Sequence, residues 1–105
     1  MSTIIKPPVN GMRPVHPGEV LREEFLIPLK MSAEALAEAL LLPPRCVIDL
    51  VQERGEITAD IALRLARYLG GDPQSWLNLQ QSHDLKVRKA EMHKVLEQIQ
   101  PYADT

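Results

Sequence analysis

The sequence predicts an all-α fold, a bundle of five helices built around one core. The chain has 105 residues, a length that supports a single domain. Aromatic residues make up only 4% of it, so aliphatic side chains must fill the core. Leu and Ala favour helices, and apolar residues recur at helical spacings with no strand pattern between them.

The N-terminal segment is expected to be an extended arm over residues 1–15, where KPPVNGMRP sets prolines close together. The stretch HPGEVLREEFLIPLK then begins the first helix. His16 lies near its cap, and Pro17 suits the first turn, where the missing N–H costs nothing. Pro28 is expected to end or kink this helix.

Two short helices joined by a tight turn follow. Ser32 is the expected N-cap of the first, over residues 32–41, and Pro44 lies in the first turn of the second, over residues 44–53. Gly55 is expected to close the second helix. The spacing is that of a helix-turn-helix, whose two helices pack through Leu36 and Ala37 on one side and Val47 and Leu50 on the other.

Two further helices complete the bundle. Thr58 caps the fourth, which ends before the pair of glycines at residues 70–71. Asp72 caps the fifth, which is expected to reach Gln100 with a break at residues 82–84. We therefore divide the chain into an arm (1–15), a helix-turn-helix domain (16–82) and a C-terminal helical extension (83–105).

Charge and cysteine content indicate which partners and which cellular compartment the chain is suited to. The net charge is −2, so any contact with nucleic acid must come from a local basic patch. The single cysteine, Cys46, cannot form an internal disulfide, which favours a reducing cytoplasm. The N-terminus has no signal-peptide core, and the longest apolar run, residues 39–42, is far too short to cross a bilayer. We expect a cytoplasmic protein with no membrane partner.

Three stretches are more specific than the helix pattern. GMRPVHPGEVLREEFL, ITADIALRLARYLGG and PQSWLNLQ together resemble the HigA-type antitoxins of bacterial toxin–antitoxin pairs, which belong to the repressor-like (XRE) helix-turn-helix family. The resemblance extends over residues 11–85. It implies a repressor-like bundle that forms a homodimer, binds operator double-stranded DNA and represses its own operon. It also implies that the protein neutralises a cognate toxin that cleaves messenger RNA.

In this architecture the second helix of the motif enters the major groove. Arg45 is the principal candidate for a base contact, because its guanidinium can donate two hydrogen bonds to guanine; a solvated arginine is the alternative. Ile48 can contact a thymine methyl group, and Gln52 can reach adenine. Asp49 can accept from cytosine N4, although it repels phosphates.

This helix departs from the family pattern. Cys46 and Ile48 stand where relatives more often carry Arg and Asn, and Ala33 and Pro44 replace a glutamine that contacts phosphate at helix starts. Cys46 is interpreted as a small hydrophobic residue. An outward face with Cys46 and Ile48 offers few hydrogen-bonding groups to DNA. It therefore supports an alternative function, a protein-interaction module that sequesters the toxin with weak or no specific DNA binding.

Contacts to DNA phosphates are expected from residues around the two helices of the motif. Ser32 and Lys30 precede the first helix of the motif. Pro44 lies at the start of the second helix, where backbone N–H groups of the first turn are free, and Arg54 follows that helix. For each side chain the alternative is an ordinary solvated position.

The dimer interface is expected in the C-terminal third, at Trp76, Leu77, Leu79, Leu85 and Met92. Trp76 has core packing as its alternative. The C-terminal helix has one apolar face, which packs either on the other protomer or back on its own domain. Arg64 and Arg67 form either a solvated face or a partner surface.

No feature predicts an enzyme. His16, His83 and His93 are far apart, and no HExxH motif or Gly-rich phosphate loop occurs. A single cysteine does not make a zinc site. We expect no catalytic residue, no metal and no cofactor.

Overall fold

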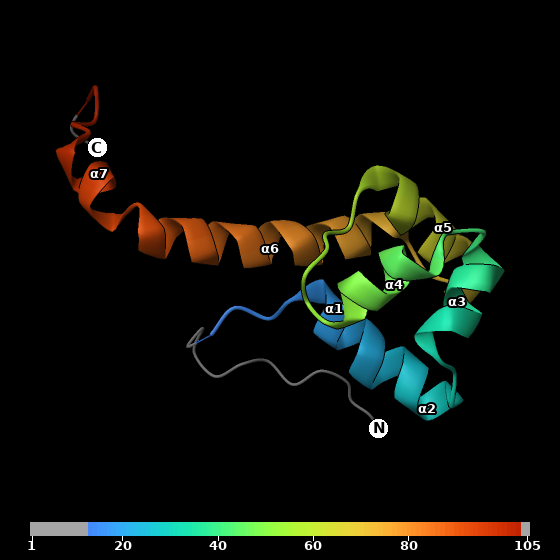
Figure 1. Cartoon of the computed structure of the whole chain (residues 1–105). Helices are drawn as coiled ribbons and strands as arrows, with labels where there is room; N and C mark the ends of the chain where they lie inside the picture. Colours follow the sequence, from blue (N-terminus) through green and yellow to red (C-terminus); the bar gives the residue numbers. More distant parts are fainter. Residues whose placement is uncertain (1–12, 104–105) are drawn as a thin grey trace.

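The computed structural model describes residues 13–103, and this part of the chain is all-α, as the sequence predicts (Figure 1). The arm expected over residues 1–15 lies almost entirely outside the described residues. The helical segments of the described part are α1 (Pro17–Val20), η2 (Leu21–Leu26), α2 (Ile27–Leu29), α3 (Ala33–Leu40), α4 (Pro44–Val51), α5 (Ala59–Leu69), α6 (Pro73–Glu91) and α7 (His93–Gln98).

The first three segments form one continuous helical rod, because Pro28 neither ends nor breaks the helix. The segment η2 is a π-helix, and at its end the N–H of Ile27 donates to the carbonyl of Arg22, five residues back. In an α-helix the ring of Pro28 would meet the carbonyl of Glu24. The wider π turn is a recognised way to admit an extra residue into a helix, and here it precedes the proline directly.

The core forms where α3 and α4 meet each other and the helices around them. The contact expected between Leu36 and Ala37 on α3 and Val47 and Leu50 on α4 is confirmed, since all four belong to the buried cluster. The remaining buried hydrophobic residues come from α1, η2, α3, α5, α6 and the segment between α4 and α5: Val20, Leu21, Leu26, Leu40, Ile57, Ala62, Leu65 and Trp76. One apolar cluster therefore fixes the position of α4.

Helix starts agree with the sequence. The side chain of Ser32 accepts a hydrogen bond from the N–H of Ala35 at 3.0 Å, which caps α3. The Thr58 hydroxyl caps α5, and the Asp72 carboxylate caps α6 in the same way. Each bond satisfies a backbone donor that the first helical turn leaves free.

Helix ends agree with the sequence prediction only in part. Helix α5 ends at Leu69, just before Gly70, as predicted. The rod that ends in α2, and helices α3 and α4, each end at a residue with left-handed backbone, Lys30 (φ 56°), Leu41 (φ 60°) and Glu53 (φ 63°). Left-handed backbone favours glycine, and Gly55 was expected to supply it after α4. Glu53 takes this conformation instead, so α4 ends at Val51, two residues earlier than predicted.

The C-terminal helices extend away from the bundle (Figure 1). Helix α6 continues unbroken through residues 82–84, where a break was expected, and the chain bends at Met92 instead. No glycine or proline marks that bend in the sequence. Helix α7 does not fold back on its own domain, and Leu85 (70% exposed) and Ile99 (60% exposed) face solvent. No helix within residues 13–103 is both long enough and apolar enough to span a membrane.

Candidate nucleic-acid interface

Helix α4 presents one polar stripe to solvent. Val47 and Leu50 face the core, whereas Arg45, Asp49 and Gln52, spaced by four and three residues, lie on the opposite side. Arg45 is exposed, Asp49 is half-buried, and Gln52 follows the last residue of α4 as its C-cap. The residues predicted to contact bases therefore share a face, except Ile48, which is half-buried beside them.

The carboxylate of Asp49 is the centre of an ion-pair cluster on this stripe. Its Oδ1 lies 2.9 Å from Nη2 of Arg54 and 3.5 Å from Nη1 of Arg45. The side chain of Asp49 is 33% exposed, against 73% for Arg45 and 57% for Arg54. The structure thus brings together two residues expected to read bases and one expected to contact phosphate.

Arg54 reaches this cluster because the chain turns back after α4. The left-handed Glu53 lets the N–H of Arg54 donate to the carbonyl of Asp49 at 2.8 Å, while the N–H of Glu53 donates to the carbonyl of Leu50 at 2.9 Å. These two bonds define a Schellman motif. Arg54 consequently lies alongside the helix, although it follows its end in sequence.

The other predicted phosphate-contacting residues lie around the two helices of the motif. Ser32 is exposed and uses its hydroxyl oxygen as the α3 cap, and Lys30 is exposed at the left-handed residue that ends α2. Pro44 is exposed in the first turn of α4 but carries no N–H, so it can only place the donors that follow it. The structure leaves each of these positions open to solvent.

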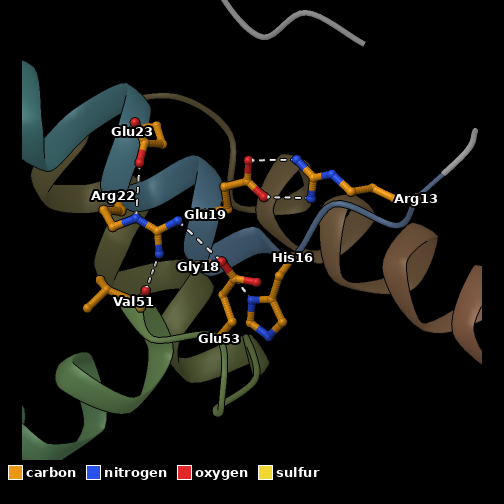
Figure 2. A network of polar contacts seen from close by, with 8 residues as sticks. All are labelled: Arg13, His16, Gly18, Glu19, Arg22, Glu23, Val51 and Glu53. Atoms are coloured by element: carbon orange, nitrogen blue, oxygen red, sulfur yellow. Dashed lines mark hydrogen bonds and ion pairs between the residues drawn. The ribbon is translucent and has the colours of Figure 1, made fainter. Parts of the chain in front are cut away.

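Arg22, on η2, holds the C-terminal end of α4 and was not singled out from the sequence. Its guanidinium donates to the carbonyl of Val51 at 2.5 Å and to the carboxylate of Glu53 at 3.2 Å (Figure 2). The same group donates to Glu23, which is the largest cause of its raised pKa. These partners are about 30 residues apart in sequence, so no spacing rule could have revealed them.

The HPGE stretch places α1 against the same end of α4. An alanine at Gly18 would put its Cβ 1.8 Å from the carbonyl oxygen of Leu50, so only glycine fits this contact. His16 Nδ1 accepts from the N–H of Gly18 at 2.8 Å (Figure 2). Its Nε2 lies 3.0 Å from the carbonyl of Gly55, to which it donates. This arrangement requires the neutral imidazole, and burial, assisted by nearby His83, lowers the pKa of His16.

Arg64 has a structural role that the sequence did not indicate. Its Nη1 donates to the carbonyls of Leu40 (2.7 Å) and Leu41 (3.0 Å), and its Nε pairs with Asp60. Arg64 thereby satisfies carbonyls at the end of α3, a role beyond the solvated or partner-binding face expected from the sequence. Arg67, one turn further on, is exposed.

The residues predicted for a dimer interface divide into two groups. Trp76 is buried and packs on Phe25 with ring centroids 5.6 Å apart, and Leu77 and Leu79 lie half-buried against the same core. Leu85 is exposed and Met92 half-buried on the part of the chain that leaves the bundle. Trp76 therefore belongs to the core of its own protomer, which leaves Leu85 as the predicted residue with the most free apolar surface.

Comparison with known proteins relates the chain to antitoxins, although no family model matches it. It is 51% identical over 86 residues to virulence-associated protein I of Dichelobacter nodosus, which covers 82% of this chain and 80% of that protein. It is 44% identical over 73 residues to antitoxin HigA-1 of Vibrio cholerae serotype O1, which covers 70% of this chain and 69% of that protein.

Solved structures give the same relationship. An antitoxin HigA of Pseudomonas aeruginosa, solved with the higBA promoter, is 42% identical, with a TM-score of 0.84 over 87% of this chain and all of that one. The antitoxin GraA in complex with its operator is 43% identical, with a TM-score of 0.83 over 90% of this chain and 97% of that one. The fold and the arrangement of its motif are thus similar to those of antitoxins crystallised on DNA.

Proposed function

Because the chain belongs to the HigA-type antitoxin family, we propose that it forms a dimer that binds operator DNA, represses its own operon and neutralises a partner toxin. The observation that carries the DNA-binding part is the outward stripe of α4. Arg45 stands at its exposed N-terminal end, the end that enters the major groove in this architecture.

Electrostatics favour a short, local contact with DNA. The chain as a whole carries a net charge of −2, so it has no general attraction for phosphates. Arg54 beside α4 and Lys30 before α3 supply positive charge where the backbone of a bound duplex would run. Few such contacts per protomer imply that two protomers must act together, with binding that weakens as salt rises.

A dimer places two α4 helices on successive major grooves, about 34 Å apart. The C-terminal part of the chain supports dimerisation, because it leaves the bundle with apolar side chains uncovered. These exposed residues are Leu85, Val95, Leu96 and Ile99. A second protomer would bury them.

The antitoxin role is inferred from the family. The relatives include an antitoxin and HTH-type transcriptional regulators, and both classes work by binding other molecules. We propose that this chain likewise acts by binding and not by catalysis, and that it does so in the cytoplasm, where operator DNA and messenger RNA are found.

The test of DNA reading is Arg45→Ala. Loss of a bidentate contact to guanine should weaken operator binding by about 1–3 kcal/mol per protomer, with the melting temperature unchanged. Arg67→Ala, which removes an exposed arginine from α5, is the matched control and should bind as the parent does. Gel-shift titrations of the three proteins on the DNA upstream of the gene make the comparison. Equal affinity for Arg45→Ala and parent would rule out Arg45 as a reader.

A second candidate function is a module that sequesters the toxin and binds DNA weakly or without specificity. The observation that favours it is the Asp49 carboxylate, which lies on the DNA-facing stripe and occupies both nearby arginines. The two functions separate at low salt, where electrostatic attraction is strongest. No preference for the upstream DNA under those conditions would favour the sequestering module.

A further inference from the structure

Asp49 has a position on α4 that suggests more than a base contact. Building on the proposed function, we propose that Asp49 is a specificity-determining residue that weakens binding to non-operator DNA. It does so by adding a negative charge to the stripe that faces the duplex, a charge left uncompensated when Arg45 and Arg54 turn from it to DNA.

The geometry shows one acceptor shared by two donors. Arg45 and Arg54 both approach Oδ1 of Asp49, at 3.5 Å and 2.9 Å, from opposite ends of α4. The backbone reinforces the second pair, because the N–H of Arg54 also donates to the carbonyl of Asp49 at 2.8 Å. Asp49 is the least exposed of the three side chains, and its short side chain keeps the carboxylate close to α4, whereas the two longer arginine side chains are more exposed.

Exposed ion pairs of this kind are weak and are further screened by salt. DNA can therefore take either arginine from Asp49 at small cost. The carboxylate itself cannot leave, and once its partners turn to DNA it faces phosphates with its negative charge uncompensated. Binding must overcome this repulsion each time the stripe meets a duplex.

Operator and non-operator DNA differ in how they offset the repulsion. At the operator, base edges return hydrogen bonds to Arg45 and can offer a cytosine amino group to the carboxylate. On other sequences only phosphates are available, and these attract the arginines but repel Asp49. Asp49 should consequently reduce non-operator binding more than operator binding, which is how an unfavourable element raises selectivity.

Asp49→Asn tests this directly, because it keeps the shape of the side chain and removes its charge. Affinities for the upstream operator and for a shuffled duplex of equal composition are measured at about 0.1 M salt. We expect the variant to bind the shuffled duplex about 3–10-fold more tightly, with a smaller change at the operator, so that the ratio of the two affinities falls. Asp49→Ala should give the same direction without an amide that could form new hydrogen bonds.

Glu91→Gln is the matched control. It also removes one carboxylate from an exposed ion pair with an arginine, Arg88, but it lies at the end of α6, far from α4 (Figure 1). It should bind both duplexes as the parent does. Equal strengthening by Glu91→Gln would assign the effect to net charge and overturn the role of Asp49.

The remaining outcomes are also decisive. An unchanged or increased affinity ratio in Asp49→Asn overturns the proposal. A ratio that falls only because operator binding weakens identifies Asp49 as a direct base reader, which also overturns it. If the parent itself binds both duplexes equally, the proposed DNA-reading function fails, and the proposal fails with it.

Discussion

Replacing Gly18 with alanine tests how closely α1 is packed on the end of α4. The added Cβ would lie 1.8 Å from the carbonyl oxygen of Leu50 and 2.8 Å from the carbonyl carbon, whereas ordinary contacts begin at 3.4 Å. Both atoms belong to the backbone, so no side-chain rotation relieves the overlap. The two helices must move apart, and the His16 hydrogen bond to the carbonyl of Gly55, which follows α4, is lost with that movement.

Inserting one carbon into a well-packed contact usually costs 1–3 kcal/mol. Because backbone atoms are involved at Gly18, we expect the upper end, about 3 kcal/mol. For a domain of this size, each kcal/mol lowers the melting temperature by about 4–8 °C, so Gly18→Ala should melt about 12–24 °C below the parent. The assay is thermal unfolding followed by circular dichroism, at equal protein concentrations because dimerisation also contributes stability.

Gly55 provides the matched control, since its neighbours are also the backbone of Leu50. A Cβ at Gly55 would lie 3.5 Å from them, which is an ordinary contact, and Gly55 has no left-handed backbone. Gly55→Ala should therefore change stability by less than about 1 kcal/mol. A Gly18→Ala protein that melts within a few degrees of the parent would refute the packing described for α1 and α4.

Two other predictions concern Arg64 and His16. Arg64→Met removes the donor to the carbonyls that end α3 and should lower the free energy of unfolding by about 1–3 kcal/mol, measured by denaturant titration. Arg67→Met on the same helix is the control and should lower it little; an equal loss in both variants would contradict the capping role of Arg64. Burial, with a smaller effect of His83, lowers the pKa of His16 in the folded protein below its ordinary 6.5. As the pH decreases through 6.5, the unfolded chain therefore takes up a proton at His16 before the folded protein does. This uptake favours the unfolded chain, so the stability of the fold decreases. The melting temperature should therefore drop between about pH 7.5 and pH 5.5 in the parent and change less in His16→Asn, and an equal drop in both proteins would exclude His16 as the cause.

Helix starts could be predicted from the sequence, because each is capped by a side chain only two or three residues from the N–H that it binds. The caps formed by Ser32, Thr58 and Asp72 are of this kind. The end of α5 could be predicted from Gly70. Three other helix ends could not, because the left-handed residues there are Lys30, Leu41 and Glu53, and not the glycine or asparagine that usually marks such a position. Long-range bonds from arginines on neighbouring helices stabilise two of these ends.

The candidate site shows the same division. The stripe of Arg45, Asp49 and Gln52 follows from helical periodicity, and the Arg45–Asp49 pair follows from a spacing of four. The return of Arg54 to the stripe depends on the left-handed backbone of Glu53, and Arg22 on another helix contacts the Glu53 carboxylate. Side chains brought together by such distant contacts cannot be found by spacing alone.

Sequence-specific binding of DNA by α4 is tested most directly by one measurement. The affinity of the parent protein for the DNA upstream of its own gene is compared with that for a shuffled duplex over a series of salt concentrations. We expect two protomers per operator, a preference of at least about 10³-fold, and affinity that falls linearly with salt on logarithmic axes. Equal affinity for the two duplexes at every salt concentration would contradict the claim.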